Sequence, residues 1–281
     1  MTSPAAANLP QRTLSSRLRH QFRIVRVIAG AEFKLKYAGS ALGYVWSVAK
    51  PLALFIMLYL VFGRVFKLGA VSHFYPLSLL MGIVLFTFFS DASLLGMSSI
   101  VARESLLRKM SFPRLIIPTS ATLTAGITLL INLTVIVGFI AWNHIVPRVS
   151  WLLIIPLVGE LYLFVLGLAL ILTTLYVRFR DVGQVWELLL QLMFYASPII
   201  YPIGYLPPWA RHLVFINPFT QVMQDVRAVI LYRDLAPNRI TASIAFGSQA
   251  GRLIPLAVVA AVFGVGLYVF KREEAWFAER S

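Results

Sequence analysis

Six long apolar stretches constrain the fold of this sequence more than any other feature. A helix that crosses a lipid bilayer needs about 20 mostly apolar residues. The stretches that reach or approach this length are Pro51–Phe66, Leu77–Val101, Leu115–Trp142, Leu152–Val177, Val185–Tyr201 and Leu253–Phe270. The sequence therefore predicts an all-α integral membrane protein with six transmembrane helices. We expect a break or kink in the fifth helix, because it is short and ends in Ser197 and Pro198.

The composition excludes several classes of protein. Of the 281 residues, 59% are hydrophobic and 13% are charged, with a mean hydropathy of +0.81. Soluble domains carry roughly a quarter charged residues, so a water-soluble core is excluded. The net charge of +14 suits loops held against an anionic leaflet better than a nucleic-acid partner. The chain has no cysteine, which excludes disulfides, thiol nucleophiles and thiolate metal sites.

Lysine and arginine predict the orientation of the chain. They gather before the first stretch, between the second and third, between the fourth and fifth, and after the sixth; the segment between the fifth and sixth is an exception, because it carries five arginines. With six spans these segments share one side, which the positive-inside rule assigns to the cytoplasm. We therefore expect cytoplasmic termini, a cytoplasmic N-terminal segment over residues 1–50 and a transmembrane domain over residues 51–281. Because the first long apolar run begins at Pro51, we expect no cleaved signal peptide.

The N-terminal segment also predicts an amphipathic helix. On a helical wheel one face carries Leu14, Leu18, Phe22, Val25, Ile28 and Ala29, and the other carries Arg12, Arg19, Arg23 and Arg26. Such a helix lies in the membrane interface with its apolar face in lipid. A simple surface anchor and a contact site for a partner both fit this pattern.

The segment between the fifth and sixth stretches is too apolar for a free external loop. Apolar residues recur at three- and four-residue spacing after Phe219, with polar residues among them. Pro207-Pro208 and Asn217-Pro218 divide the segment, so we expect two short helices at Leu206–Ile216 and Phe219–Tyr232. We expect them to be re-entrant, dipping into the outer leaflet beside a water-filled lumen. A loop lying on the membrane surface is the alternative.

Motifs for catalysis and for nucleotide binding are missing. The sequence contains no P-loop and no zinc-binding H-E-x-x-H, and its four histidines are scattered. Asp91, Glu160 and Glu187 are the acids within the expected spans, and their roles are left open. We therefore expect no catalytic residue, no metal site and no cofactor in this chain. Energy for any transport must come from elsewhere.

The connection from Arg103 to Arg114 has the composition of a docking surface. It reads RESLLRKMSFPR, with apolar residues among charged ones and a proline near its end. Exposed apolar side chains surrounded by charge suggest contact with a partner. The residues expected to dock are Arg103, Leu106, Leu107, Arg108, Lys109, Met110, Phe112, Pro113 and Arg114. An ordinary positive loop would explain the charges but not the apolar side chains.

An ordered series of short motifs resembles the ABC-2-type export permeases that move lipid-linked polysaccharides out of bacteria. The series begins with Lys-x-Lys-Tyr-x-Gly-Ser-x-Leu-Gly-x-x-Trp at Lys34–Trp46, followed by Pro51 and Leu52. It continues with Phe88–Asp91, Arg108–Arg114, Arg180–Val182, Gln191–Leu192, Ser197–Ile199, Tyr201–Pro202 and Asn217–Pro218. The resemblance covers about Phe33 to Phe270. The chain departs from the family pattern at Ala31 and Glu32, where Arg-Asp is common, and at Lys36 and Lys50, where arginine and asparagine are common.

The resemblance implies a mechanism and its partners. Two copies of this chain would join two copies of a separate ATPase that holds ATP and Mg²⁺, in the bacterial inner membrane. The Arg103–Arg114 segment would be the coupling helix, and Lys34, Lys36 and Arg180 would receive the diphosphate of a polyprenyl-linked polysaccharide. The sugar chain would pass aromatic residues, for which the candidates are Tyr37, Tyr44, Tyr59, Trp186, Phe194, Tyr195 and Tyr201. An external gate would include Pro207, Trp209, Asn217, Pro218 and Phe219.

Two alternatives remain from the sequence. An ABC-2 exporter of drugs or small lipids would share the fold and the docking segment. A proton-coupled secondary carrier would need no ATPase and would depend on the acids within the spans.

Overall fold

The structure, a computed structural model, describes residues 14–37, 43–70, 73–104, 113–231 and 240–274. These residues form helices and connections, without strands. The α-helices are α1 (Leu14–Tyr37), α2 (Val45–Leu58), α3 (Tyr75–Ala102), α5 (Ile116–Trp142), α6 (Ile154–Arg178), α7 (Val182–Ala196), α8 (Pro208–Ile216), α9 (Pro218–Ile230), α10 (Ala242–Ala245) and α11 (Leu253–Glu273). A π-helix, η1 (Tyr59–Val65), continues α2, and 3₁₀ turns lie at Leu68–Ala70, Val149–Leu153, Ile203–Tyr205 and Gln249–Arg252.

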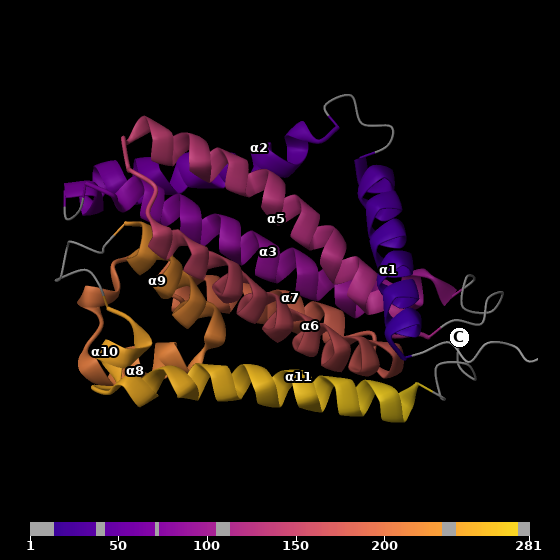
Figure 1. The fold of residues 1–281 in the computed structure, drawn as a ribbon. Coiled ribbons are helices and arrows are strands. Elements are labelled where there is room, and N and C mark those ends of the chain that lie inside the picture. Colours follow the sequence, from indigo (N-terminus) through magenta and orange to yellow (C-terminus); the bar gives the residue numbers. More distant parts are fainter. Residues whose placement is uncertain (1–13, 38–42, 71–72, 105–112, 232–239, 275–281) are drawn as a thin grey trace, which may run out of the picture.

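The long helices form a bundle around α3, which packs against α5 on one side and α6 on the other (Figure 1). Within an 18-residue window, 72% of α3 is buried, against 17% for the α2–η1 span and 22% for the α11 span. The apolar residues of α3 are spread around the whole helix, as expected for a helix enclosed by others. The core therefore lies along α3, and the outer helices are left with uncovered faces.

Five helical spans in the described part of the chain are long and apolar enough to cross a membrane. They are Val45–Val65, Tyr75–Ala102, Ile116–Trp142, Val149–Arg178 and Ala250–Glu273. Five of the six predicted stretches are thus confirmed within a few residues. The first span differs most from its prediction, because it begins at Val45 rather than at Pro51. Pro51 is the seventh residue of α2, where it cannot donate the helical hydrogen bond to the carbonyl of Ser47, and the helix continues through it from Val45 to Leu58.

The predicted fifth span, Val185–Tyr201, is not among these five helices. Its helix, α7, begins at Val182 and ends at Ala196, and its 15 residues are about 22 Å long, less than a bilayer core. Ser197 is extended because the following Pro198 disfavours the helical conformation. The residues from 197 to 200 are buried without being helical. The predicted break at Ser197 and Pro198 is therefore present, but the helix is too short to span by itself.

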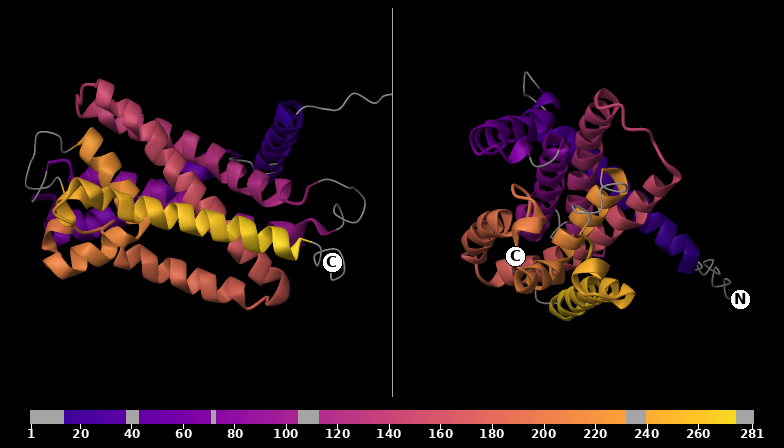
Figure 2. Two further views of the ribbon diagram at one scale, coloured as in Figure 1. Left: turned by 60° about the horizontal axis from the view of Figure 1, so that its bottom comes forward. Right: turned by 90° about the vertical axis from the view of Figure 1, so that its left-hand side faces the viewer.

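Helix α1 lies across one end of the bundle and packs on α5 (Figure 2). Val25 and Ala29, two residues of its predicted apolar face, are buried, whereas Arg19, Arg23 and Arg26 are exposed. Phe22, from the same predicted face, is 66% exposed. The amphipathic helix is thus present, and part of its apolar face contacts protein.

Helices α8, α9 and α10 gather at the opposite end of the bundle (Figure 1). The two predicted short helices are present as α8 and α9, with bounds that differ by one or two residues. Helix α9 is enclosed on all sides, since every residue from Pro218 to Ala228 is buried. Among these residues is Arg227, which is 3% exposed. Arg227 donates hydrogen bonds to the carbonyls of Ser78 (2.8 and 3.1 Å), Pro198 (2.7 Å) and Ile199 (3.2 Å).

Candidate functional site

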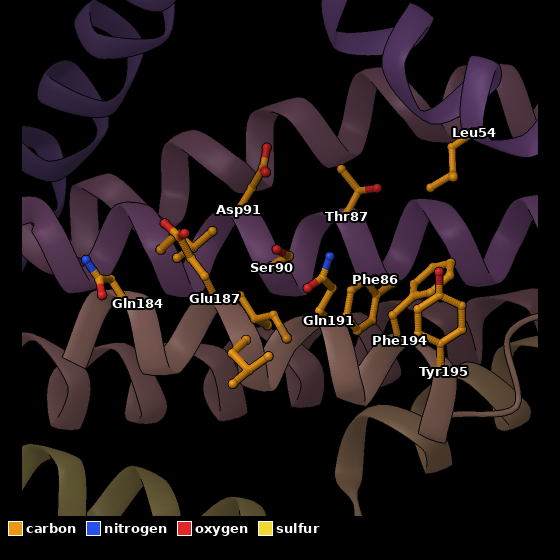
Figure 3. Close-up of a pocket in the computed structure, with 13 residues that line it drawn as sticks. Leu54, Phe86, Thr87, Ser90, Asp91, Gln184, Glu187, Gln191, Phe194 and Tyr195 are labelled. Carbon is orange, nitrogen blue, oxygen red and sulfur yellow. The ribbon is translucent and has the colours of Figure 1, made fainter. Parts of the chain in front are cut away.

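A groove of about 730 Å³ runs between α3 and α7. Figure 3 shows the side chains that line it, most of them from these two helices. They are Leu54, Phe86, Thr87, Ser90, Asp91, Leu94, Gln184, Glu187, Leu188, Leu190, Gln191, Phe194 and Tyr195. Pockets of this size can hold a small ligand or a segment of a longer one.

The groove is lined by a polar stripe on each helix. On α3 the stripe contains Thr87, Ser90 and Asp91, and on α7 it contains Gln184, Glu187 and Gln191. Spacings of three and four residues place such side chains on one face of a helix. Gln184, Glu187 and Gln191 are all exposed. Because polar side chains within a membrane face a wet cavity or another protein, this face of α7 is not suited to contact lipid.

Trp186 decides which face of α7 is turned to the groove. It is 8% exposed, packs near Phe89 and donates a hydrogen bond from its indole nitrogen to the Ser93 hydroxyl at 3.0 Å. Leu190, one turn further on, is also buried. A tryptophan that satisfies its only donor in the core fixes the rotation of its helix. Trp186 was predicted to be a channel aromatic, and the structure places it in the core against α3.

The other predicted channel aromatics fall into separate groups. Phe194 and Tyr195 line the groove, where Phe194 packs edge-on against Phe86 at 5.1 Å. Tyr59 stacks on Phe55 and lies under the Arg64 guanidinium, and the hydroxyl of Tyr201 donates to the carbonyl of Ala196. Tyr44 stacks on Phe33 at 5.1 Å. The side chain of Tyr37 lies outside the described residues.

At the end of the bundle crossed by α1, an ion pair joins two elements that the sequence did not connect. The Arg103 guanidinium pairs with the Glu32 carboxylate, and Thr124 of α5 donates to the same carboxylate at 3.2 Å. Burial raises the pKa of the Glu32 carboxyl, which Arg103 and Thr124 partly oppose. Burial also lowers the pKa of Arg103, which Glu32 partly opposes. The pair fixes α1 against the end of α3, where the predicted docking segment begins.

Most of the predicted docking segment cannot be placed, because Leu106, Leu107, Arg108, Lys109, Met110 and Phe112 lie outside the described residues. Of the remaining residues, Arg103 is paired with Glu32, Pro113 is exposed, and the backbone N–H of Arg114 donates to the Glu274 carboxylate at 3.1 Å. The base of the segment therefore contacts α1 and the end of α11.

The candidates for a diphosphate site lie on different elements at this end of the molecule. Lys34 is exposed on α1. Arg180 is exposed in the connection between α6 and α7, where its guanidinium lies over the Tyr176 ring at 5.2 Å. The side chain of Lys36 lies outside the described residues.

The predicted gate residues divide between the surface and the core. Pro207 and Trp209 are exposed, Trp209 to 67%. Asn217 caps α9 by accepting a hydrogen bond from the Phe219 N–H at 3.0 Å, and Pro218 is buried. The Phe219 ring is fully buried against Phe86 and Phe89, both at 5.4 Å. Phe219 thus connects the α8–α9 region to the core beside the groove.

The three acids within the predicted spans do not form one cluster. Asp91 and Glu187 line the groove from opposite helices, whereas Glu160 on α6 has a hydrogen bond with Gln221 of α9.

Gln184, Gln191, Ser90, Thr87 and Phe86 were not predicted as site residues. Their three- and four-residue spacing within apolar stretches was the signal that could have identified them.

Comparison with known proteins places this architecture in a family. Residues 23–231 match the ABC-2 type transporter family. The chain is 30% identical to the O-antigen export system permease protein RfbA of Klebsiella pneumoniae, over 79% of this chain and 83% of that protein. It is 30% identical to the RfbA of Myxococcus xanthus, over 88% and 91%. It is 23% identical to the polysialic acid transport protein KpsM of Escherichia coli, over 92% and 98%. From the family match and these similarities, the chain belongs to the ABC-2 type transporter family of membrane proteins.

Proposed function

We propose that this chain is the membrane subunit of an ABC transporter that exports polyprenyl-diphosphate-linked polysaccharide across the bacterial inner membrane. The observation that carries this function is the groove between α3 and α7. Its hydroxyls and carboxamides can hydrogen-bond to sugar hydroxyls, and its rings can stack on the apolar faces of sugars. The names of the relatives, which refer to O-antigen export and polysialic acid transport, support the choice of polysaccharide as cargo.

A dimer of this chain would close the groove into a passage. A single bundle leaves the groove open on one side, and the α2–η1 span has little of its surface buried. Closed twofold dimers are the commonest assembly of identical subunits. The partner copy would then cover the polar face of α7, which is costly to leave in lipid. The passage would run from the α1 end of the bundle to the α8–α10 end, with both termini in the cytoplasm.

The α1 end would receive the carrier and the motor. Lys34, Lys36 and Arg180 would bind the diphosphate, because ionised donors form strong hydrogen bonds with phosphate oxygens. A separate ATPase would dock on the Arg103–Arg114 segment and move it during hydrolysis. The ion pair of Glu32 and Arg103 supports this arrangement, since it joins the base of that segment to α1. At the other end α8 and α9 would gate the exit.

The first test is to co-express this chain with its neighbouring ATPase and purify the complex into lipid nanodiscs. We expect a complex with two copies of each chain, and ATP hydrolysis stimulated by a polyprenyl-diphosphate-linked oligosaccharide. Phe112→Asp should abolish assembly or stimulation, because it places a charge on the expected docking face. Phe179→Asp is the matched control, since Phe179 is exposed in the neighbouring connection between α6 and α7.

Other outcomes would indicate the two alternatives. Stimulation by drugs or short lipids, but not by the oligosaccharide-linked carrier, would support an exporter of small molecules. Transport that follows a proton gradient, needs no ATPase and is lost in Glu160→Gln would support a secondary carrier.

A further inference from the structure

The charged side chains that line the groove between α3 and α7 are all acidic. Of its 13 lining residues, Asp91 and Glu187 are acidic and none is basic. This contrasts with the chain as a whole, which has 25 lysines and arginines against 11 acids. The acids therefore define the sign of the potential in the groove.

Glu187 carries most of this argument. It is exposed on the groove face of α7, whereas Asp91 is half-buried and has an interaction of its own within the chain. Figure 3 shows both carboxylates in the same half of the groove, with the rings of Phe86, Phe194 and Tyr195 at the other end. A chain moving along the groove would pass the carboxylates and the rings in turn.

The remaining lining groups are neutral. Gln184, Gln191, Ser90 and Thr87 offer donors and acceptors that match hydroxyl groups, and the rings offer stacking surfaces. None of these groups compensates the charge of a carboxylate-bearing sugar. Clefts with low-dielectric walls concentrate the field of the charges that line them, so a fixed carboxylate acts strongly on a charged ligand there.

We propose that this groove selects uncharged saccharide chains and disfavours polyanionic ones, with Glu187 as the main determinant. This inference rests on the proposed function and names the class of polysaccharide that the site accepts. The distinction matters within the family, because one relative is named for the transport of polysialic acid, an anionic polymer.

The absence of cysteine allows a direct measurement of the potential in the groove. Gln191→Cys places one thiol among the lining residues of the purified complex. We expect it to react faster with a cationic than with an anionic methanethiosulfonate reagent of similar size, by about tenfold after correction for their rates with a free thiol. Adding Glu187→Gln should reduce this ratio several-fold, and adding Glu187→Lys should invert it. Ser248→Cys is the control, because Ser248 is exposed, lies outside the groove and has nearly the same shape as cysteine.

A second measurement tests the selection itself. Two polyprenyl-diphosphate-linked probes of equal length are compared, an oligomannose and an oligoglucuronate, through their stimulation of ATP hydrolysis. We expect the oligomannose to reach half-maximal stimulation at a concentration about tenfold lower than the oligoglucuronate. Glu187→Gln should narrow the difference, chiefly by improving the response to the oligoglucuronate.

The outcomes distinguish this inference from the function on which it rests. If the ratio of the reaction rates with the cationic and the anionic reagent does not change in Glu187→Gln, the role of Glu187 is overturned. Equal stimulation by both probes would overturn the selection, while export of polysaccharide would stand. If neither probe stimulates a complex whose ATPase is active, the proposed function fails together with this inference.

Discussion

Arg227 joins three separate segments of the chain. Its guanidinium binds the carbonyl of Ser78 at the start of α3 and the carbonyls of Pro198 and Ile199 after α7, while its backbone belongs to α9. Non-helical backbone inside a membrane must have its polar groups satisfied by protein. Arg227 does this for the break after α7. A β-carbon at Gly82 would lie 2.5 Å from this guanidinium, so the glycine leaves it room.

We therefore predict that Arg227→Lys destabilises the protein by about 3 kcal/mol or more, because an ammonium group cannot replace a planar fork of donors and leaves buried acceptors unpaired. Thermal unfolding in detergent measures the effect. Arg211→Lys is the control, since Arg211 donates to two carbonyls from a less buried position. It should cost about 1 kcal/mol or less. Equal melting temperatures for the two variants would contradict this role of Arg227.

The pair of Glu32 and Arg103 predicts a dependence of stability on pH. Burial raises the pKa of Glu32 above its usual value of 4.5, so the folded state binds a proton more readily than the unfolded chain. The contribution of Glu32 to stability is therefore greatest below pH 4.5 and falls as the pH rises from there to the folded pKa. The difference in melting temperature between wild type and Glu32→Gln, measured across this range, reports the effect.

Arg103→Gln provides the matched comparison for that experiment. Arg103 opposes the rise in the pKa of Glu32, so its removal should raise that pKa further and move the loss of stability to higher pH. A pH profile that is the same in Arg103→Gln and wild type would show that the pair does not form in solution.

At the scale of helices, the backbones of α6 and α11 lie close together where each helix has a glycine. A β-carbon added at Gly167 would lie 2.5 Å from the Cα of Phe263, and one at Gly266 would lie 2.3 Å from the carbonyl oxygen of Gly167. Small residues allow such close approach of backbones, which is how helices in membranes commonly associate. The backbones of α6 and α11 therefore approach each other closely at these two glycines.

We predict that Gly167→Ala destabilises the protein by about 1–3 kcal/mol, because the two backbones must move apart. Gly159→Ala, in the same helix, is the control. Nothing lies within 4 Å of a β-carbon at Gly159, so alanine should be neutral or stabilising by up to about 1 kcal/mol. Both can be measured as shifts of the thermal unfolding midpoint. A destabilised Gly159→Ala beside an unchanged Gly167→Ala would contradict the contact.

At the scale of the whole molecule, α3 is the element around which the others are built. It contacts α2, α5, α6, α7 and α9, and Thr173 of α6 donates to the carbonyls of Gly96 and Met97 within it. The outer spans have most of their surface uncovered by protein. The bundle therefore depends on α3 from within and on lipid or further chains from outside.

This architecture predicts an order of hydrogen exchange in detergent micelles. The backbone amides of α3 should exchange most slowly, because local opening is rarest where packing is densest. Those of the α2–η1 span should exchange faster, and the addition of the ATPase partner and lipid should slow them. Mass spectrometry of peptides after exchange measures both. Equal protection of α3 and α2 would contradict the central place of α3.

The sequence by itself determined the membrane class of the protein, five of its spans, the break at Ser197 and Pro198, and the family. These follow from local properties, namely runs of apolar residues, the geometry of proline and the order of short motifs, which do not depend on distant contacts. Gln184, Glu187 and Gln191 could also have been recognised as one face of a helix. The end of α7 at Ala196 also follows from Pro198, but the burial of the backbone beyond it depends on hydrogen bonds from Arg227, which is distant in sequence.

Only the tertiary structure decided which residues meet. The sequence predicted Trp186 as a channel aromatic and Phe219 as a residue of the external gate. Both lie in the core, where they contact side chains of α3. The pairing of Glu32 with Arg103 joins residues separated by 71 positions, and Arg227 binds a carbonyl 149 residues away. Such pairs arise from the packing of whole helices, which no local pattern encodes. The groove has the same origin, since it exists only where two polar stripes, each readable in its own helix, are brought face to face.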